Sequence, residues 1–78
     1  MRAKKPTLVI TFDSTTQAMA AEKLCTDLAL PGRLIPIPRQ ISAGCGLSWK
    51  AAPEAREPLL AALEQAGLLW SGCHIVEI

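Results

Sequence analysis

The fold is decided by residues 7–25, TLVITFDSTTQAMAAEKLC, in which a strand pattern passes directly into a helix start. Every second residue from Leu8 to Phe12 falls on one side of an extended chain and is apolar, which predicts a strand with one buried face. The residues between them are expected to face away from the core. Ser14 followed three residues later by Gln17 matches a capping box, so the first helix should begin directly after this strand.

The rest of the chain continues with strands and a second helix. Three further segments have strand patterns: residues 33–37, 46–51 and 73–78. A second helix is expected from near residues 53–54, with its regular part starting as late as Pro58. Pro31-Gly32 should stop the first helix, and Gly67 should cap the second.

The order of these elements predicts the fold class. Strand, helix, strand, strand, helix, strand is the ferredoxin-like split βαβ pattern. We therefore expect an α+β protein, a ferredoxin-like βαββαβ two-layer sandwich, with both helices on one face of an antiparallel sheet of order 4-1-3-2. Pro36 and Pro38 cannot donate ladder hydrogen bonds, so the second strand should lie at an edge of the sheet.

The apolar faces of these elements predict the core. Trp49 and Trp70 are expected to anchor the packing rather than to form a ligand cage. The expected core residues are Leu8, Ile10, Leu24 or Cys25, Leu28, Leu47, Leu59 and Leu63.

Length and composition predict a single domain, residues 1–78, without nucleic-acid or membrane partners. The chain is 50% hydrophobic, which argues for a folded globule, and no apolar run approaches the ~20 residues that cross a bilayer. Its net charge is +1 and its cations are scattered in sequence, whereas nucleic-acid binding needs a concentrated basic face. The basic start at residues 1–5 precedes too short an apolar segment for a signal peptide, so we expect a leaderless cytoplasmic protein.

Three cysteines, Cys25, Cys45 and Cys73, dominate the possible chemistry of the chain. Because their number is odd and no signal peptide is expected, a disulfide scaffold is disfavoured. There is no C-x-x-C pair and a single histidine, His74, so we expect no metal site and no cofactor. Cys25 lies on the apolar stripe of the first helix and should be a buried filler. The sequence leaves two roles open for Cys73, a filler of the core or a second reactive thiol.

The candidate site is the glycine-flanked thiol at Gly44-Cys45-Gly46. Glycines carry no side chain that could cover the thiol, and they let backbone N–H groups approach a bound anion. Arg39 is a candidate cation, and the backbone around Ser42 is a candidate contact for an anionic adduct. The competing interpretations are an ordinary hairpin cysteine between turn glycines and a solvated loop arginine.

The expected topology brings this loop near two other segments. In sheet order 4-1-3-2, residues 13–16, 36–46 and 70–74 meet at the end of the sheet toward which the first helix points its N-terminus. The helix dipole would then favour a thiolate at Cys45. His74 belongs to a strand two positions from the third strand, so direct contact with Cys45 is not expected, while a role as base or ligand stays open.

The segment from residue 33 to residue 47, RLIPIPRQISAGCGL, resembles the selenium/sulfur carrier-like family of small bacterial domains. Residues 11–23 resemble the opening strand and helix of the family, so the resemblance covers nearly the whole chain. It implies a non-catalytic thiol carrier rather than an enzyme, with Cys45 holding sulfur or selenium as a persulfide or perselenide. It also implies donor and acceptor proteins as partners, such as a cysteine desulfurase.

Other function classes compete with the carrier. The main alternative is a small ferredoxin-like binding or regulatory module that contacts an anion or a partner protein through the Gly-rich loop, with Cys45 incidental. A metallochaperone is disfavoured because the C-x-x-C pair is absent. An exposed sheet edge favours a homodimer. The choice between sulfur and selenium, and any part played by Cys73 or His74, stays open.

Overall fold

The computed structural model describes residues 5–38, 41 and 46–78. The elements along these residues are β1 (Pro6–Thr11), α1 (Thr15–Asp27), β2 (Arg33–Pro36), β3 (Leu47–Ala51), the 3-10 helix η1 (Pro53–Ala55), α2 (Arg56–Gln65) and β4 (Gly72–Glu77). The predicted order of strands and helices is confirmed, with the short helix η1 as an addition. Pro58 lies in the first turn of α2, where its missing N–H leaves no helical hydrogen bond unmade.

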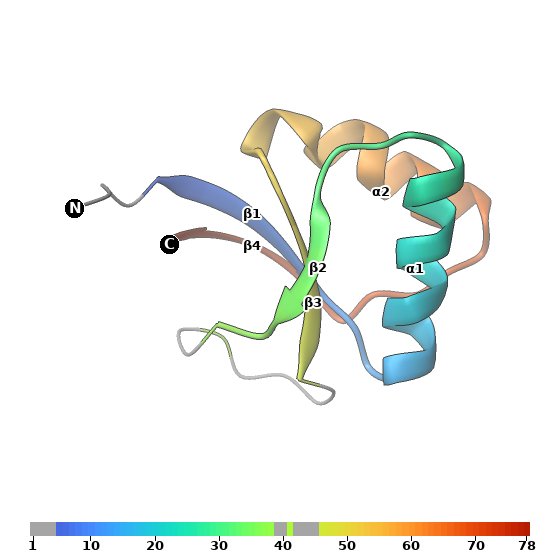
Figure 1. The fold of residues 1–78 in the computed structure, drawn as a ribbon, viewed down its shortest axis with the longest axis horizontal. Coiled ribbons are helices and arrows are strands. Elements are labelled where there is room, and N and C mark those ends of the chain that lie inside the picture. The colour runs from blue at the N-terminus through green and yellow to red at the C-terminus, as the bar shows by residue number, and fades with distance from the viewer. Residues whose placement is uncertain (1–4, 39–40, 42–45) are drawn as a thin grey trace.

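The strands form one antiparallel sheet, and α1 and α2 lie on one side of it (Figure 1). The strand order is β2-β3-β1-β4, which is the predicted order 4-1-3-2 counted from the other edge. β2 is an edge strand, as its prolines predicted, and β4 forms the opposite edge. The protein is therefore α+β, with an arrangement compatible with the ferredoxin-like pattern.

The core lies between the sheet and the two helices. Most predicted core residues are confirmed as buried: Leu8, Ile10, Cys25, Leu59 and Leu63. Leu24 and Leu47 are half-buried against this cluster. The two tryptophans are packing residues as predicted, because Trp49 is 4% exposed and Trp70 packs against the cluster from the segment before β4.

Leu28 is an incorrect core prediction, since its side chain is 54% exposed. Helix α1 ends at Asp27, and the chain reverses at Ala29, which has a φ of 55°. The N–H of Leu30 then donates to the carbonyl oxygen of Cys25 at 2.8 Å, and Leu30 packs against the core. The helix end thus directs Leu30 instead of Leu28 toward the sheet.

Strand β1 is buried on both faces, whereas the alternation predicted one buried face. On the face without helices, Val9 is fully buried and Thr11 is 1% exposed. β1 is a central strand, and Val9 lies directly between its cross-strand partners Lys50 on β3 and His74 on β4. Long side chains on flanking strands shield the smaller residue between them.

Among the described residues, no helix is long and apolar enough to cross a membrane.

Candidate functional site

The connection between β2 and β3 carries the predicted thiol, and the structure describes how its two ends are held. The N–H of Ile37 donates to the carbonyl oxygen of Gly46 at 2.9 Å, one step beyond the last strand pair, Pro36 with Leu47. Within the connection, the N–H of Ile41 donates to the carbonyl oxygen of Pro38 at 3.0 Å, and Ile41 is buried. The connection therefore starts and ends at adjacent points on the sheet, and Ile41 packs inward.

Gly46 has a backbone conformation that favours glycine. Its φ is +79°, in the left-handed region that glycine adopts without strain. A Cβ atom added there would meet nothing within 4 Å, so the space around Gly46 is open. The glycine is needed for its backbone angle and not to avoid a clash.

The other predicted site residues lie outside the residues that the structure describes. These are the thiol residue and three of its predicted neighbours: Arg39, Ser42, Gly44 and Cys45. Their roles therefore stay predictions from the sequence.

The described parts of the three segments predicted to converge do lie at one end of the sheet. Thr11 at the end of β1 pairs with Ser48 near the start of β3 and with Gly72 at the start of β4. The first turn of α1, the end of β2 and the start of β3 all lie at the bottom of Figure 1. Ser14 caps α1 there by accepting the N–H of Gln17 at 3.2 Å.

The capping box is only half formed. The side chain of Gln17 does not return to Ser14; its Oε1 accepts the N–H of Leu69 at 3.3 Å. This hydrogen bond ties the segment between α2 and β4 to the start of α1. It therefore helps to hold the start of β4 at the same end of the sheet as the β2–β3 connection.

A cluster of hydroxyl groups at this end was not predicted from the sequence. The Thr11 and Ser71 hydroxyl oxygens are 3.0 Å apart, and the Ser71 N–H donates to the Thr11 carbonyl oxygen at 2.8 Å. A Cβ added to Gly72 would lie 2.7 Å from Nε2 of His74 and 3.1 Å from the Thr11 hydroxyl, so the imidazole lies over Gly72. The signal in the sequence was weak, because these residues come together only through the β1–β4 register.

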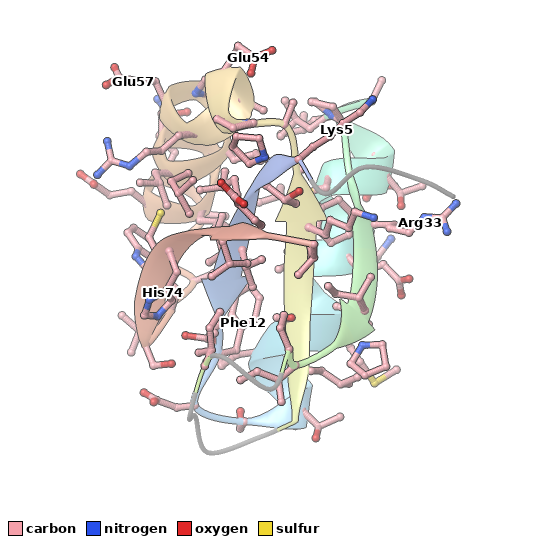
Figure 2. All side chains as sticks on the ribbon, turned by 90° about the vertical axis from the view of Figure 1, so that its left-hand side faces the viewer. Lys5, Phe12, Arg33, Glu54, Glu57 and His74 are labelled. Carbon is pink, nitrogen blue, oxygen red and sulfur yellow. The ribbon has the colours of Figure 1, made fainter. Side chains whose placement is uncertain are left out.

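His74 is exposed on an edge strand, with β1 between it and β3, as the topology predicted. Figure 2, which views the sheet from the face opposite the helices, shows His74 on β4 at that edge. The described structure thus brings His74 together with Thr11 and Gly72. Nothing in it pairs His74 with the start of β3.

The two described thiols are both tied to the core. Cys25 is 1% exposed, and burial raises its pKa because an ionised sulfur would lose its hydration. Cys73 is half-buried and packs against the same core. The prediction that Cys25 is a buried filler is confirmed, and the position of Cys73 favours packing over a role as an accessible second thiol.

Metal chemistry finds no support in the described part of the chain. No group of three or more His, Cys, Asp or Glu side chains there is arranged to hold a metal ion.

Comparison with known proteins assigns the family. Residues 7–75 match the model of the family described as "Putative Se/S carrier protein-like", and the chain belongs to this family. No curated protein and no solved structure matches the chain.

Proposed function

We propose that the protein is a sulfur or selenium carrier that holds the chalcogen atom on Cys45 and passes it to a partner protein. The family membership carries this proposal, because it covers the β2–β3 connection along with most of the chain. The state of the other two thiols supports it. Cys25 is buried and Cys73 packs against the core, which leaves Cys45 as the candidate for exchange with another protein.

The loading step is a thiolate exchange that balances without a further reactant. The Cys45 thiolate attacks the terminal sulfur of a donor persulfide, R–S–SH. A bond forms between Sγ of Cys45 and that sulfur, the donor S–S bond breaks, and the electron pair leaves with the donor thiolate R–S⁻. The proton stays on the transferred sulfur, giving Cys45–S–SH. A donor perselenide, R–S–SeH, reacts by the same steps and gives Cys45–S–SeH.

The chain needs few other groups for this chemistry. A carrier needs an accessible thiolate and no metal or built-in general base, because the partner enzymes supply the reacting groups. Arg39 and backbone N–H groups near Ser42 to Gly46 would stabilise the anionic adduct, since charge-assisted hydrogen bonds are the stronger kind. The fixed ends of the connection would present the thiol at a defined place for attack by the acceptor.

The partners in this proposal are a donor and an acceptor protein, the donor being of the cysteine desulfurase class. A cytoplasmic location belongs to the same proposal, because a carrier cysteine has to return to a free thiol between transfers, and cytosolic reductants keep thiols reduced. The ferredoxin-like sandwich is the proposed fold class of the carrier.

The test is mass spectrometry of the full chain after incubation with a cysteine desulfurase and cysteine. We expect one added sulfur atom on Cys45. Cys45→Ser should abolish loading and keep the fold, and Arg39→Ala should weaken loading. Cys73→Ser is the matched control and should load like the wild type, because Cys73 packs against the core.

Alkylation kinetics check the same site independently. With iodoacetamide and peptide mapping, Cys45 should be labelled fastest and Cys25 slowest, because Cys25 is 1% exposed. If wild-type protein gains neither sulfur from any persulfide donor nor selenium from any perselenide donor on Cys45, the carrier proposal falls. The alternative, a binding module, would then replace the carrier proposal. It requires that the protein keeps its function after Cys45 is alkylated.

A further inference from the structure

A large hollow lies at the opposite end of the sheet from the thiol connection. Its volume is about 690 Å³, and it is formed by the first residues of β1 and β2, the last residues of β3 and the start of η1. Volumes of roughly 300–1,000 Å³ are typical of small-ligand sites. Lys5, Arg33 and Lys50 line it together with one carboxylate, Glu54, and we call this hollow the cation groove.

The register of the sheet brings the cations of this groove together. Arg33 on β2 pairs directly with Lys50 on β3, and their shared face is the one opposite the buried Trp49. Like charges in directly opposed positions repel each other. Lys5 lies just before β1, and Figure 2 shows Lys5 and Glu54 at the top of the sheet, with Arg33 beyond β2. Cations that are scattered in sequence thus gather at one place in the fold.

Gly32 makes the close approach of these strands possible. Its φ is +117°, and an added Cβ would collide with the carbonyl oxygen of Lys50 and with the indole nitrogen of Trp49. The Trp49 Nε1–H donates to the carbonyl oxygen of Pro31 at 3.1 Å and fixes the start of β2 against β3. The chain therefore holds Arg33 and Lys50 beside each other at a defined separation.

Among the described residues, the groove cations form no salt bridge. The salt bridge in the described part of the chain joins Lys23 to Asp27 on α1. No salt bridge there involves Lys5, Arg33 or Lys50. Three cations and one carboxylate line the groove of a chain whose net charge is only +1. Lys50 is half-buried, so its repulsion with Arg33 is screened less than that of fully exposed charges.

We propose that the cation groove binds a compact anionic ligand with two or more negatively charged oxygen atoms, of the phosphate or the polycarboxylate class. The anion would neutralise the opposed Arg33 and Lys50, and the guanidinium would bind its oxygens in a bidentate manner. Ala51, Ala52 and Pro53 offer an apolar surface for the rest of the ligand. Because cations from separate elements converge on one hollow, a compact ligand fits better than an extended acidic peptide. This inference is independent of the proposed thiol function.

The test is an amide-shift NMR titration of the full chain with pyrophosphate and, separately, with citrate, in about 100 mM salt. We expect saturable binding with a Kd of ~1 mM or tighter for at least one of the two anions. The shifted amides should belong to residues 5–7, 32–33 and 50–54, and those of residues 71–75 should stay unchanged. Binding of pyrophosphate alone assigns the phosphate class, and binding of citrate alone assigns the carboxylate class.

Charge variants identify the groups that bind. The double variant of Arg33→Gln and Lys50→Gln should weaken binding by at least about 10-fold, because hydrogen bonds to charged groups are the strong ones. Lys23→Gln removes one exposed cation on α1 and is the matched control, with binding unchanged. Glu54→Gln removes the opposing carboxylate and should strengthen binding by roughly 2- to 5-fold.

Two outcomes overturn the proposal. The first is the absence of saturable binding of either anion; if a glutamate-rich peptide then binds at these residues, the groove is a protein-docking surface. The second is binding that the double variant and Lys23→Gln weaken equally, which would indicate general charge attraction.

Discussion

Cys25 is a thiol whose ionisation is coupled to folding. It lies on the buried face of α1 with 1% of its surface exposed, and burial raises its pKa by removing water from the charged form. Once the pH exceeds the ordinary thiol pKa, the unfolded chain releases this proton while the folded chain keeps it. The free energy of unfolding is therefore at its full value below the ordinary thiol pKa and falls as the pH rises above it.

We expect this loss of stability to begin near pH ~8.5 and to be smaller in Cys25→Ala than in the wild type. The measurement is urea unfolding at a series of pH values. The quantity compared between variants is the slope of the free energy of unfolding against pH, and not its absolute value. Leu63→Val is the matched control, since it removes volume from the same buried cluster without removing a titratable group, and it should keep the wild-type slope. A Cys25→Ala slope equal to that of the wild type would contradict the coupling.

Single residues could be predicted where one local pattern decides their environment. The apolar stripe of α1 predicted the burial of Cys25. The contact between Thr11 and Ser71 could not be predicted, because it depends on a register that joins residues 60 positions apart. The cation groove escaped prediction for the same reason, since Arg33 and Lys50 are opposed only once β2 and β3 are paired.

At the scale of elements, α1 and α2 end in the same motif with different residues at its critical position. Beyond α1, the N–H of Ala29 donates to the Thr26 carbonyl oxygen at 3.2 Å. The N–H of the next residue, Leu30, donates to the Cys25 carbonyl oxygen. Beyond α2, the N–H of Gly67 donates to the Glu64 carbonyl oxygen at 3.0 Å. The N–H of Leu68 donates to the Leu63 carbonyl oxygen at 2.9 Å. Both are Schellman ends, which require a left-handed residue and favour glycine.

We therefore expect Ala29→Gly to raise the free energy of unfolding by about 1 kcal/mol and Gly67→Ala to lower it by about the same amount. Ala29 has a φ of 55° and Gly67 a φ of 74°, so both occupy the region that costs an L-residue energy. A Cβ at Gly67 would meet nothing within 4 Å, so its cost is conformational and not steric. Chemical denaturation of both variants measures the effect, and stabilisation by Gly67→Ala would show that the motif does not control stability.

The order of elements could be predicted because each element has a local signal, whereas their ends depend on packing. The alternation of apolar and polar residues predicted β1 and β3. The prolines Pro36 and Pro38 correctly predicted that β2 lies at an edge of the sheet. The helix end at Asp27 has no proline or glycine directly after it, which is why Leu28 was assigned to the core. The predicted cap at Gly67 was correct because glycine marks that position in the sequence.

On the scale of the whole molecule, the sheet separates two candidate sites. The β2–β3 connection leaves one end of the sheet, near Thr11 and the start of β4, and the cation groove lies at the other end. Both helices cover the same face, so the second face and the edges of the sheet remain without a helical cover (Figure 1). These uncovered surfaces are where a second chain could bind.

The edge at β4 leads us to expect a homodimer. In the described part of the chain, the outer side of β4 pairs with no other strand, and Ile75 on it is 53% exposed. β2 is a poor partner because Pro36 lies in the strand and Pro38 follows it, whereas β4 contains no proline. An exposed edge strand without proline pairs readily with a second copy of itself.

The measurement is light scattering at high micromolar concentration. The wild type should have the mass of a dimer, and Ile75→Lys should shift the protein to the monomer, because a charged side chain on an edge strand opposes pairing. Leu69→Lys is the matched control, since Leu69 is an exposed apolar residue, 67% accessible, that lies outside β4, and this variant should remain dimeric. A monomeric wild type would refute the dimer, and a dimer that Ile75→Lys leaves intact would move the contact away from β4 to the uncovered face of the sheet.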